Sequence, residues 1–441
     1  MSPKNRSDIL LVHAGIGSCG FNCYGRGMDE SWVNHGLASI HAFLKGQGTD
    51  SLYLDLRRLK HWRHFRETIK ELRPGNVGIS ATTVDAAVAL RAAGVIKSIR
   101  EDIVTVIGGI HASVCPEEFT KSAHFDHVVL GEGERTFADI VARSAGPGII
   151  PGQLLVDLDS LPFIDRSVFG DRETPLYPPL FPQPFVTFIA SRGCPFNCSF
   201  CQPAEKILFG KKMRSRSPKN LASEIKKCRL DMGMKSFLIH DDCLLWNPGW
   251  VEEFLGILSG QKVNMPFAVQ SRADLICKHP RLVSRLAEQG LRMVLIGFES
   301  GSQKILDFLR KGTTVEQNME AAKICKANNI AIWANYMFGI PGETAEDVAQ
   351  TVRMIRTIQP EVNSPSFFVP YPGTDLHTYC MAEGLSLVQH PRDFRRNPEG
   401  KKIKGIDYRQ LRKAVRLASG SPALLFHLKK WRHRLRQRFK L

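Results

Sequence analysis

The most constraining feature of the sequence is a loop in which three cysteines follow an apolar strand. The cysteines are Cys194, Cys198 and Cys201, and the predicted strand is the apolar run 185–190. Three thiolates at C-x3-C-x2-C spacing can bind three irons of a [4Fe–4S] cluster and leave the fourth iron without a protein ligand, whereas ferredoxin sequences supply a cysteine to each iron. An iron without a protein ligand can bind a substrate or a cofactor.

A structural zinc site, or three unrelated buried thiols, is the alternative interpretation of this loop. Structural zinc sites use four ligands, usually as two separated pairs. No second pair with the spacing of a zinc ribbon or finger follows Cys201. The loop therefore favours an open iron–sulfur cluster at the carboxyl end of the strand.

The composition indicates a multidomain enzyme of a reducing compartment. A chain of 441 residues is too long for one ordinary core, so we expect two domains and an appendage. Its 43% hydrophobic and 23% charged residues are typical of soluble globular proteins. Eleven scattered cysteines do not form a dense disulfide framework. No signal peptide and no bilayer-length apolar run are evident, which predicts a cytoplasmic protein.

The amino-terminal third alternates short strands with helices. The predicted strands are 9–13, 51–55, 77–80, 104–107 and 127–130, and the predicted helices lie near 32–46, 85–100 and 134–143. This alternation is typical of a doubly wound parallel sheet, which binds its ligands at the carboxyl ends of the strands. Two glycine-bearing loops, 108–111 and 131–134, fall at those ends. An alternative is that their glycines only permit tight strand-to-helix turns.

A second α/β region follows a proline-rich connector at 146–184, where prolines exclude long helices. The predicted strands are 185–190, 235–240, 266–270, 293–298, 331–338 and 363–369, and each precedes a helix-like stretch. Polar groups at the ends of barrel strands are candidates for function.

The cysteine loop, with its Gly-Cys-Pro-Phe-Asn-Cys context, resembles that of the radical S-adenosylmethionine (SAM) superfamily. The resemblance implies that the open iron chelates the amino and carboxylate groups of SAM, and that the six βα units form a partial (β/α)6 barrel. Phe200, the aromatic residue before the last cysteine, also fits this family and is expected at the SAM site.

The amino-terminal region resembles the cobalamin-binding domain that precedes the barrel in one large radical SAM subfamily. The resemblance implies cobalamin contacts from residues at three strand ends: Ser80, Gly108, Gly109, His111, Gly131, Glu132 and Gly133. Domains that coordinate cobalt from below use Asp-x-His-x-x-Gly after the first strand. Here only His13 of that pattern is kept, so we do not expect this histidine pattern to hold cobalt.

Together these resemblances predict an α/β chain of four segments. A doubly wound, Rossmann-like cobalamin domain occupies 1–145 and a linker 146–184. The radical SAM barrel occupies 185–385, and a basic extension 386–441 ends in a helical tail.

The resemblance also implies SAM contacts at the ends of the later strands. The candidates are Asp241, Asp242, Gln270, Arg272, Glu299, Ser300, Gly339 and Pro341. An acidic residue after the second strand can accept hydrogen bonds from the SAM ammonium group, and Arg272 can meet its carboxylate. Glu299 and Ser300 are expected near the ribose or amino-acid portion. Each charged candidate can instead form an ion pair inside the barrel.

Three further residues have less defined roles. Tyr371, after the sixth strand, can quench a substrate radical or line the pocket. Cys19 and Cys23 stand in the loop after the first strand, where ordinary loop thiols are favoured over a role near cobalt or substrate.

These patterns predict a radical SAM enzyme with a [4Fe–4S] cluster, SAM and cobalamin, similar to the anaerobic magnesium-protoporphyrin monomethyl ester cyclases and class B radical SAM methyltransferases. The leading function is C-methylation at an unactivated carbon of a small-molecule or lipid-like substrate, with flavodoxin or ferredoxin as reductant. Radical oxidation, cyclisation or rearrangement of a tetrapyrrole or lipid-like substrate is the alternative. A non-catalytic cobalamin or tetrapyrrole sensor or carrier is the second alternative.

The net charge of +17 is concentrated in part at the carboxyl terminus. Residues 424–441 have an apolar stripe at three- and four-residue steps and seven basic residues without an acidic neighbour. This pattern predicts a basic amphipathic helix that docks on the enzyme or lies peripherally on an anionic membrane. Nucleic acid is the least favoured partner.

Overall fold

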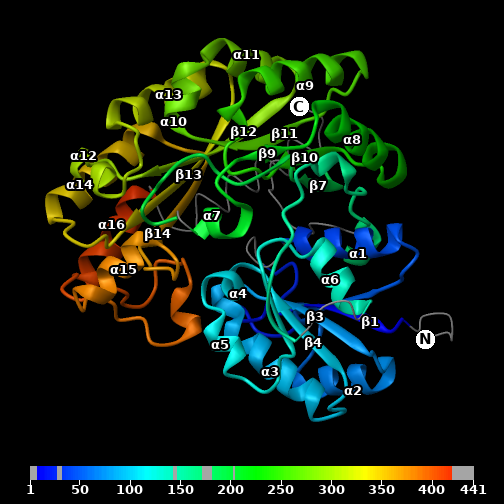
Figure 1. Ribbon diagram of the computed structural model, residues 1–441. Coiled ribbons are helices and arrows are strands. Elements are labelled where there is room, and N and C mark those ends of the chain that lie inside the picture. Colours follow the sequence, from blue (N-terminus) through cyan, green and yellow to red (C-terminus); the bar gives the residue numbers. More distant parts are fainter. Residues whose placement is uncertain (1–6, 27–31, 143–146, 171–180, 202–203, 420–441) are drawn as a thin grey trace.

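The computed structural model describes residues 7–26, 32–142, 147–170, 181–201 and 204–419. Their strands form two six-stranded parallel sheets and one short antiparallel ribbon. Figure 1 shows the first sheet in blue and cyan and the second in green to orange, with helices on the faces of both. The predicted α/β class is confirmed.

The amino-terminal sheet has the strand order β2-β1-β3-β4-β5-β6. The strands are β1 (Ile9–His13), β2 (Leu52–Asp55), β3 (Asn76–Ser80), β4 (Val104–Gly108), β5 (His127–Leu130) and β6 (Gly148–Pro151). The helices are α1 (His35–Gly46), α2 (Trp62–Leu72), α3 (Ala86–Lys97), α4 (Ile110–Val114), α5 (Glu117–Thr120) and α6 (Glu134–Val141). This order is doubly wound, as expected from the alternation of strands and helices.

Alternation along β1 explains how both faces of this sheet are covered. Ile9 and Leu11 pack with α1 and α6 on one face. Leu10 and Val12 pack on the other face with the helices that include α2 and α3. Because successive strand residues point to opposite faces, a strand that is apolar throughout must be buried on both sides.

Strand β6 lies within the segment expected to be a linker. It pairs only with β5, so it is an edge strand of the sheet, and the proline at its end costs no ladder hydrogen bond there. The sequence did not predict this strand, because the prolines around it indicate a connector. The amino-terminal sheet therefore continues past residue 145.

The second sheet has the order β14-β13-β12-β11-β10-β7 and curls into a half-barrel. Its strands are β7 (Phe185–Phe188), β10 (Ser236–Ile239), β11 (Phe267–Ser271), β12 (Leu291–Glu299), β13 (Ala331–Phe338) and β14 (Val362–Phe367). The helices between them are α7 (Ala204–Phe209), α8 (Pro218–Met232), α9 (Pro248–Gly260), α10 (Ala273–Lys278), α11 (Pro280–Glu288), α12 (Gln303–Phe308), α13 (Val315–Ala327) and α14 (Ala345–Ile358). The six predicted βα units are thus present, and β8 (Ser191–Arg192) with β9 (Arg214–Ser215) forms the ribbon.

Local sequence explains where the barrel helices begin. Ser217 and Asn247 cap α8 and α9, and a proline occupies the first turn of each. Thr314 and Thr344 form capping boxes at α13 and α14.

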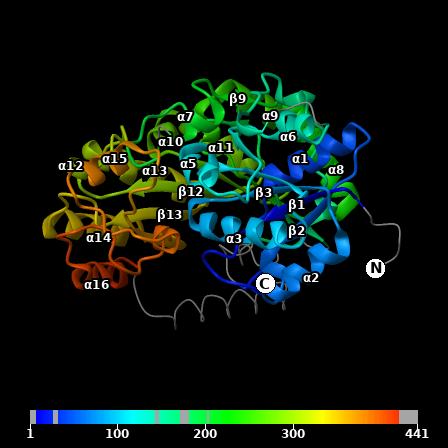
Figure 2. The same cartoon turned by 60° about the horizontal axis from the view of Figure 1, so that its bottom comes forward.

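The chain that follows β14 packs on the barrel. It forms α15 (Asp375–Ala382), and the extension after residue 385 adds the short helix η8 (Pro391–Phe394) and α16 (Tyr408–Ala418). Tyr408 and Leu411 of α16 are buried in the large core formed with the barrel helices, and Figure 2 shows α16 beside α14. The amphipathic helix predicted for 424–441 lies outside the described residues. Among the residues described, no helix combines the length and the apolar character needed to cross a membrane.

Candidate functional site

The carboxyl ends of the two sheets face a common cavity of about 440 Å³. Parallel strands place the loops after them at one edge of the sheet, and loops of both sheets line this cavity. Of the SAM candidates, Asp241 and Asp242 are among the described residues that line it. The connector contributes as well, because Leu158 and the run 161–164 line the cavity. The segment expected to be only a linker is thus part of the wall.

The amino-terminal wall includes the two glycine loops predicted to bind cobalamin. The predicted residues Ser80, Gly108, Gly109, Gly131, Glu132 and Gly133 all line the cavity. Gly109 and Gly131 have φ of 97° and 80°, a region that favours glycine. A Cβ on Gly109 would lie 2.9 Å from the carbonyl oxygen of Ala81, and one on Gly131 would lie 2.9 Å from that of Leu208. Both glycines therefore allow turns in which the backbone approaches other backbone too closely for a Cβ.

His111 differs from the other predicted cobalamin residues. It is buried, it is not among the described residues that line the cavity, and its Nε2 lies 3.1 Å from a carboxylate oxygen of Glu118. His13 also lies at the end of a strand, and its Nδ1 is 3.0 Å from Nδ2 of Asn34. Burial lowers the pKa of His13, so its imidazole is neutral at neutral pH.

The barrel wall includes residues 189–193, which lead into the cysteine loop, and residues 240–242, which follow β10. The three cysteines themselves are not among the described residues that line the cavity. The three thiols differ in exposure, since Cys198 is buried, Cys194 half-buried and Cys201 exposed. Nη1 of Arg272 lies 3.7 Å from Sγ of Cys198, and its guanidinium lies over the ring of Phe196 at 3.6 Å. A cation beside a thiol favours the thiolate, which is the form that binds iron. Three thiols in one loop next to a cation fit the donor set of an open [4Fe–4S] cluster.

Asp241 holds the start of the cysteine loop. Its carboxylate accepts hydrogen bonds from the backbone N–H of Ala190 at 2.7 Å and of Ser191 at 3.2 Å, and from the Ser191 hydroxyl at 2.6 Å. Burial raises the pKa of Asp241 to about 6, although these hydrogen bonds oppose the shift. Asp241 thus contacts the loop, and both Asp241 and the exposed Asp242 line the cavity.

Two other predicted SAM residues lie in ion pairs at the barrel mouth. Arg272 pairs with Asp274 at 2.9 Å and donates to the carbonyl oxygen of Lys311 at 2.7 Å. Glu299 pairs with the buried Lys311 at 2.9 Å. Burial opposes the charge of Lys311, but Glu299 outweighs it and raises the pKa of the lysine. The alternative considered for Glu299, an ion pair inside the barrel, is what the structure contains.

The remaining SAM candidates are spread over the strand ends. Ser300 is fully buried, and its Oγ lies 3.1 Å from Oγ1 of Thr351. Gly339 has φ of 80°, and a Cβ there would lie 3.1 Å from Leu411 of α16. The other three are the half-buried Gln270 and Phe200 and the buried Pro341. Phe200 lies beside Lys311, whose Nζ is 5.9 Å from the ring centroid.

Tyr371 is held by the extension. Its hydroxyl donates to the carbonyl oxygen of Phe394, and its ring stacks on that residue at 5.7 Å. Burial raises the pKa of Tyr371 to about 12. The adjacent Arg395 reaches the amino-terminal sheet, where Nη2 donates to the carbonyl oxygen of Gly17 at 2.9 Å.

An ion-pair network between the two sheets was not predicted. Glu132 accepts from Arg214 at 2.6 Å and from Arg192 at 3.0 Å, and Arg192 also pairs with Glu134 at 2.6 Å. Burial opposes the ionisation of Glu132, but the two arginines outweigh it and lower the pKa of the carboxyl. Glu132, expected to contact cobalamin, thus joins the glycine loop to the cysteine loop. Arg192 and Glu134 are 58 residues apart, and no local pattern in the sequence links them.

Two histidines in the cavity wall were also missed. His35 contacts Thr187 of β7 at 2.8 Å, and His240 stacks on Trp32 at 4.6 Å. Burial lowers the pKa of His240 to about 4 and that of His35 well below its ordinary value. Both imidazoles are therefore neutral at neutral pH. Their positions at the start of a helix and the end of a strand were the only available signal.

Cys19 and Cys23 form a disulfide in the loop after β1. The sequence favoured two ordinary loop thiols, and the two side chains are instead joined to each other. Gly17 of the same loop fixes it on two sides. Its carbonyl oxygen accepts from Arg395, and its N–H donates to Asp85 at 2.8 Å.

Comparisons with known proteins agree with this geometry. The family model of the radical SAM superfamily matches residues 188–355, and that of the B12 binding domain matches residues 26–141. An uncharacterized methyltransferase of Pyrococcus horikoshii is 29% identical over 377 residues, which cover 79% of each chain. The anaerobic magnesium-protoporphyrin IX monomethyl ester cyclase of Rubrivivax gelatinosus is 28% identical over 83% of this chain and 69% of its own.

A solved structure has the same fold over nearly the whole chain. It is the radical SAM methyltransferase TsrM from Kitasatospora setae with cobalamin and a [4Fe–4S] cluster bound. The TM-score is 0.70 at 16% identity, over 95% of this chain and 92% of that chain. The expected cofactors of this chain are supported by the two family matches: a [4Fe–4S] cluster and SAM for the second sheet, and cobalamin for the first. The chain is a radical SAM enzyme, and it belongs to the group of that superfamily in which a B12-binding domain precedes the radical SAM domain.

Proposed function

We propose that the enzyme transfers a methyl group to an unactivated carbon. The observation that carries this proposal is the common cavity, because the glycine loops of the B12-binding domain and residues 191–193, which begin the cysteine loop of the radical SAM domain, line the same space. When bound, the [4Fe–4S] cluster with SAM supplies a 5′-deoxyadenosyl radical, and cobalamin supplies a methyl group. A substrate in this cavity would be within reach of both.

The residues of the barrel wall have complementary roles in this proposal. Cys194, Cys198 and Cys201 hold the cluster. Asp241 fixes the backbone that leads into their loop through its three hydrogen bonds. Arg272 lies at Cys198 and places positive charge beside the cluster, in reach of a SAM carboxylate at the open iron.

The residues of the amino-terminal wall provide space. Gly108, Gly109, Gly131 and Gly133 line the cavity without side chains, which lets a large ligand approach the backbone closely. Ser80 adds a hydroxyl that accepts a hydrogen bond from Asn34 at 3.3 Å. We assign cobalamin to this wall, with the boundary of its domain placed after β6.

The substrate-facing part of the wall is apolar and holds neutral polar groups. The connector contributes Leu161, Pro162, Phe163 and Ile164, and His240 contributes an uncharged imidazole. Apolar walls exclude water from a reactive radical, and a neutral imidazole can bind a hydroxyl, a carbonyl or a metal centre of a substrate. These features support a small-molecule or lipid-like substrate, tetrapyrroles included.

Product analysis tests the proposal. The enzyme is purified without oxygen, its cluster and cobalamin are reconstituted, and it is incubated with SAM, reduced flavodoxin and a panel of tetrapyrroles and polyisoprenoid lipids. Methyl transfer gives 5′-deoxyadenosine and S-adenosylhomocysteine together, and the product gains one methyl group. 5′-Deoxyadenosine without S-adenosylhomocysteine would instead support a different radical outcome, and neither product would support a sensor or carrier.

Radical oxidation or cyclisation is the second candidate. The relative from Rubrivivax gelatinosus is named as a cyclase and is similar to this chain over 83% of its length, so the shared architecture serves more than one outcome. A substrate that loses hydrogen without gaining a methyl group would favour this candidate.

We also propose that residues 424–441 bind an anionic membrane surface. This segment lies outside the described residues, and the proposal is based on its apolar stripe and seven basic residues. The intact enzyme should sediment with anionic vesicles at low salt, and a chain ending at residue 423 should not. Loss of the cluster in the shortened chain would instead show that the segment belongs to the fold, and salt-sensitive RNA binding by the intact chain would replace the membrane with nucleic acid.

A further inference from the structure

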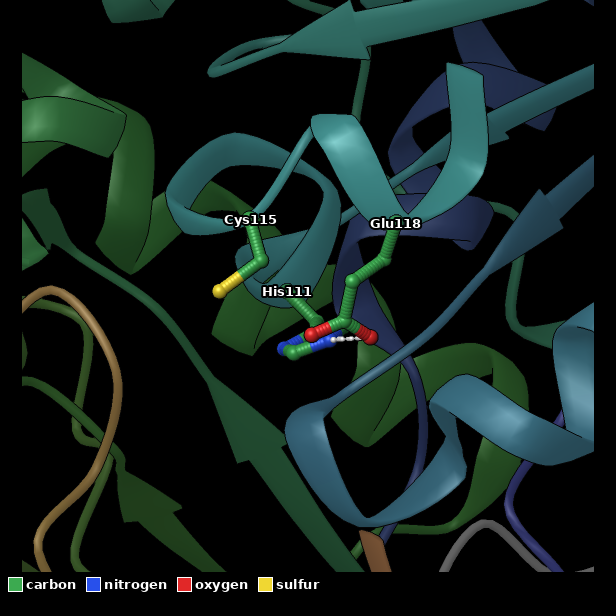
Figure 3. Close-up of side chains that lie close together, drawn as sticks. All are labelled: His111, Cys115 and Glu118. Carbon is green, nitrogen blue, oxygen red and sulfur yellow. Dashed lines mark hydrogen bonds and ion pairs between the residues drawn. The ribbon is translucent and has the colours of Figure 1, made fainter. Parts of the chain in front are cut away.

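A cluster of potential metal ligands lies on α4 and α5, apart from the described site. A ring nitrogen of His111, the thiol of Cys115 and a carboxylate oxygen of Glu118 all lie within 4.8 Å of one another. Figure 3 shows His111 and Glu118 side by side, joined by a hydrogen bond, with the side chain of Cys115 near the same turn. The three residues come from one short stretch of chain, so their spacing depends on the local turn alone.

His111 has the features of a preoriented ligand. Only 2% of the residue is exposed, and its ring packs edge-on against Phe119 with centroids 5.7 Å apart. Nε2 lies 3.1 Å from Glu118, whereas Nδ1 is buried and has no hydrogen-bond partner in the part of the chain that the structure describes. With its proton on Nδ1, His111 directs the lone pair of Nε2 toward Glu118. The 3.1 Å between Nε2 and the carboxylate oxygen is close to the separation of about 3.3 Å between two ligand atoms in a tetrahedral zinc site, so an ion can take the place of this hydrogen bond.

The other two groups complete a mixed donor set. Cys115 is a half-buried free thiol, and the side chain of Glu118 is 52% exposed, which leaves a path for an ion and a water ligand. Nitrogen, sulfur and oxygen donors together are typical of zinc, which accepts three protein ligands and one water.

We propose that His111, Cys115 and Glu118 form a divalent-metal site that takes zinc, separate from the iron–sulfur cluster and from cobalamin. The thiol must lose its proton on binding, so one proton is released to solvent for each zinc bound.

The location gives this site a structural role. Helix α4 begins directly after Gly109 of the cavity wall. At its other end, Val114 packs so closely on the loop after β14 that a Cβ on Gly373 would lie 2.9 Å from its Cγ1. An ion that joins α4 to α5 would fix both ends of this helix, and hence the position of the wall relative to the barrel.

Metal analysis of the holoenzyme tests the site. The enzyme with its cluster and cobalamin is dialysed against zinc alone, and zinc, iron and cobalt are measured in the same sample by mass spectrometry. The wild type should bind one zinc per chain. Cys115→Ser and Glu118→Gln should each weaken zinc binding at least about tenfold and leave iron unchanged. The matched control Cys277→Ser changes another half-buried thiol and should bind zinc like the wild type.

X-ray absorption at the zinc edge gives a second, independent measurement. The wild type should show one sulfur ligand at about 2.3 Å together with nitrogen or oxygen ligands. The sulfur contribution should disappear in Cys115→Ser. The proposal is wrong if the wild type with a full cluster takes up no zinc, if both ligand variants bind zinc as tightly as the wild type, or if Cys277→Ser loses zinc equally.

Discussion

The two walls of the cavity are built by different means. On the barrel side, polar side chains hold the structure: Asp241 binds the loop backbone, and Arg272 and Lys311 lie in buried ion pairs. On the opposite side, the glycine loops depend on backbone conformation, with Gly109 and Gly131 at positive φ. We therefore expect the barrel side to be sensitive to the loss of single polar atoms and the glycine loops to be sensitive to the gain of single methyl groups.

The largest effect tests the barrel wall at the cluster itself. Replacing Cys194, Cys198 or Cys201 by Ala removes one of three protein ligands, so each variant should lose iron–sulfur absorption and all SAM cleavage. Iron content and 5′-deoxyadenosine formation measure this. Cys277→Ala is the control and should keep both, and a full cluster in any of the three variants would contradict the ligand assignment.

The next effect concerns the network that joins the walls. Glu132→Ala leaves Arg192 and Arg214 near each other without their shared carboxylate, and breaking such a buried pair costs about 3–5 kcal/mol. The free energy of unfolding should fall by an amount of this order, with weaker retention of cobalamin. Glu67→Ala removes the exposed partner of Arg63 and should cost less than about 1 kcal/mol. Equal costs for the two variants would show that the network contributes no more than a surface pair.

Strand positions could be predicted from the sequence because they depend on local patterns. Strands β1 and β13 coincide with the predicted 9–13 and 331–338, since apolar runs between turn residues need no distant information. The cysteine loop was evident for the same reason. Strand β6 escaped prediction because an edge strand tolerates the prolines that exclude a central one.

The partners of the polar side chains could not be predicted. Asp241 was assigned to SAM, but its partner Ser191 is 50 residues away and becomes a neighbour only when β7 and β10 pair. The same holds for Glu299, because its partner Lys311 is 12 residues away in the chain and follows α12. A charge at a strand end indicates proximity to the cavity and does not indicate which group it faces.

Two variants of Asp241 test whether the cysteine loop needs a hydrogen-bond acceptor at this position or a negative charge. Asp241→Ala leaves three donors without their acceptor, at about 1–3 kcal/mol each, and should reduce cluster content severely. Asp241→Asn keeps the oxygen that the two backbone N–H groups use, and the Ser191 hydroxyl can rotate to accept from the amide. The Asn variant should therefore retain the cluster, as measured by iron per chain. Equal loss in both variants would mean that the charge itself is required.

The pH dependence of Asp241 follows from its raised pKa. The folded state holds this proton more tightly than the unfolded state, so the contribution to stability is complete below the ordinary pKa of 3.8 and is lost as the pH rises through about 6. The stability of the wild type relative to Asp241→Asn should thus fall by about 3 kcal/mol across that window. Denaturant unfolding of both proteins across this pH range measures the difference. A difference that rises with pH would show that the hydrogen bonds outweigh burial.

The smallest effect is expected when one methyl group is added to the glycine loop 131–134 of the amino-terminal wall. Gly131→Ala must adopt φ near 80° and place its Cβ 2.9 Å from the carbonyl oxygen of Leu208, so we expect a loss of about 1–3 kcal/mol. Because Leu208 belongs to α7 of the barrel, the shift should move the glycine loop at the cavity and weaken cobalamin retention while iron content stays unchanged. Gly48→Ala is the matched control, since it has a similar φ of 79° and open space around its Cβ. If Gly48→Ala and Gly131→Ala lose the same stability and both keep cobalamin, backbone strain alone explains the cost and the close approach at this wall has no functional role.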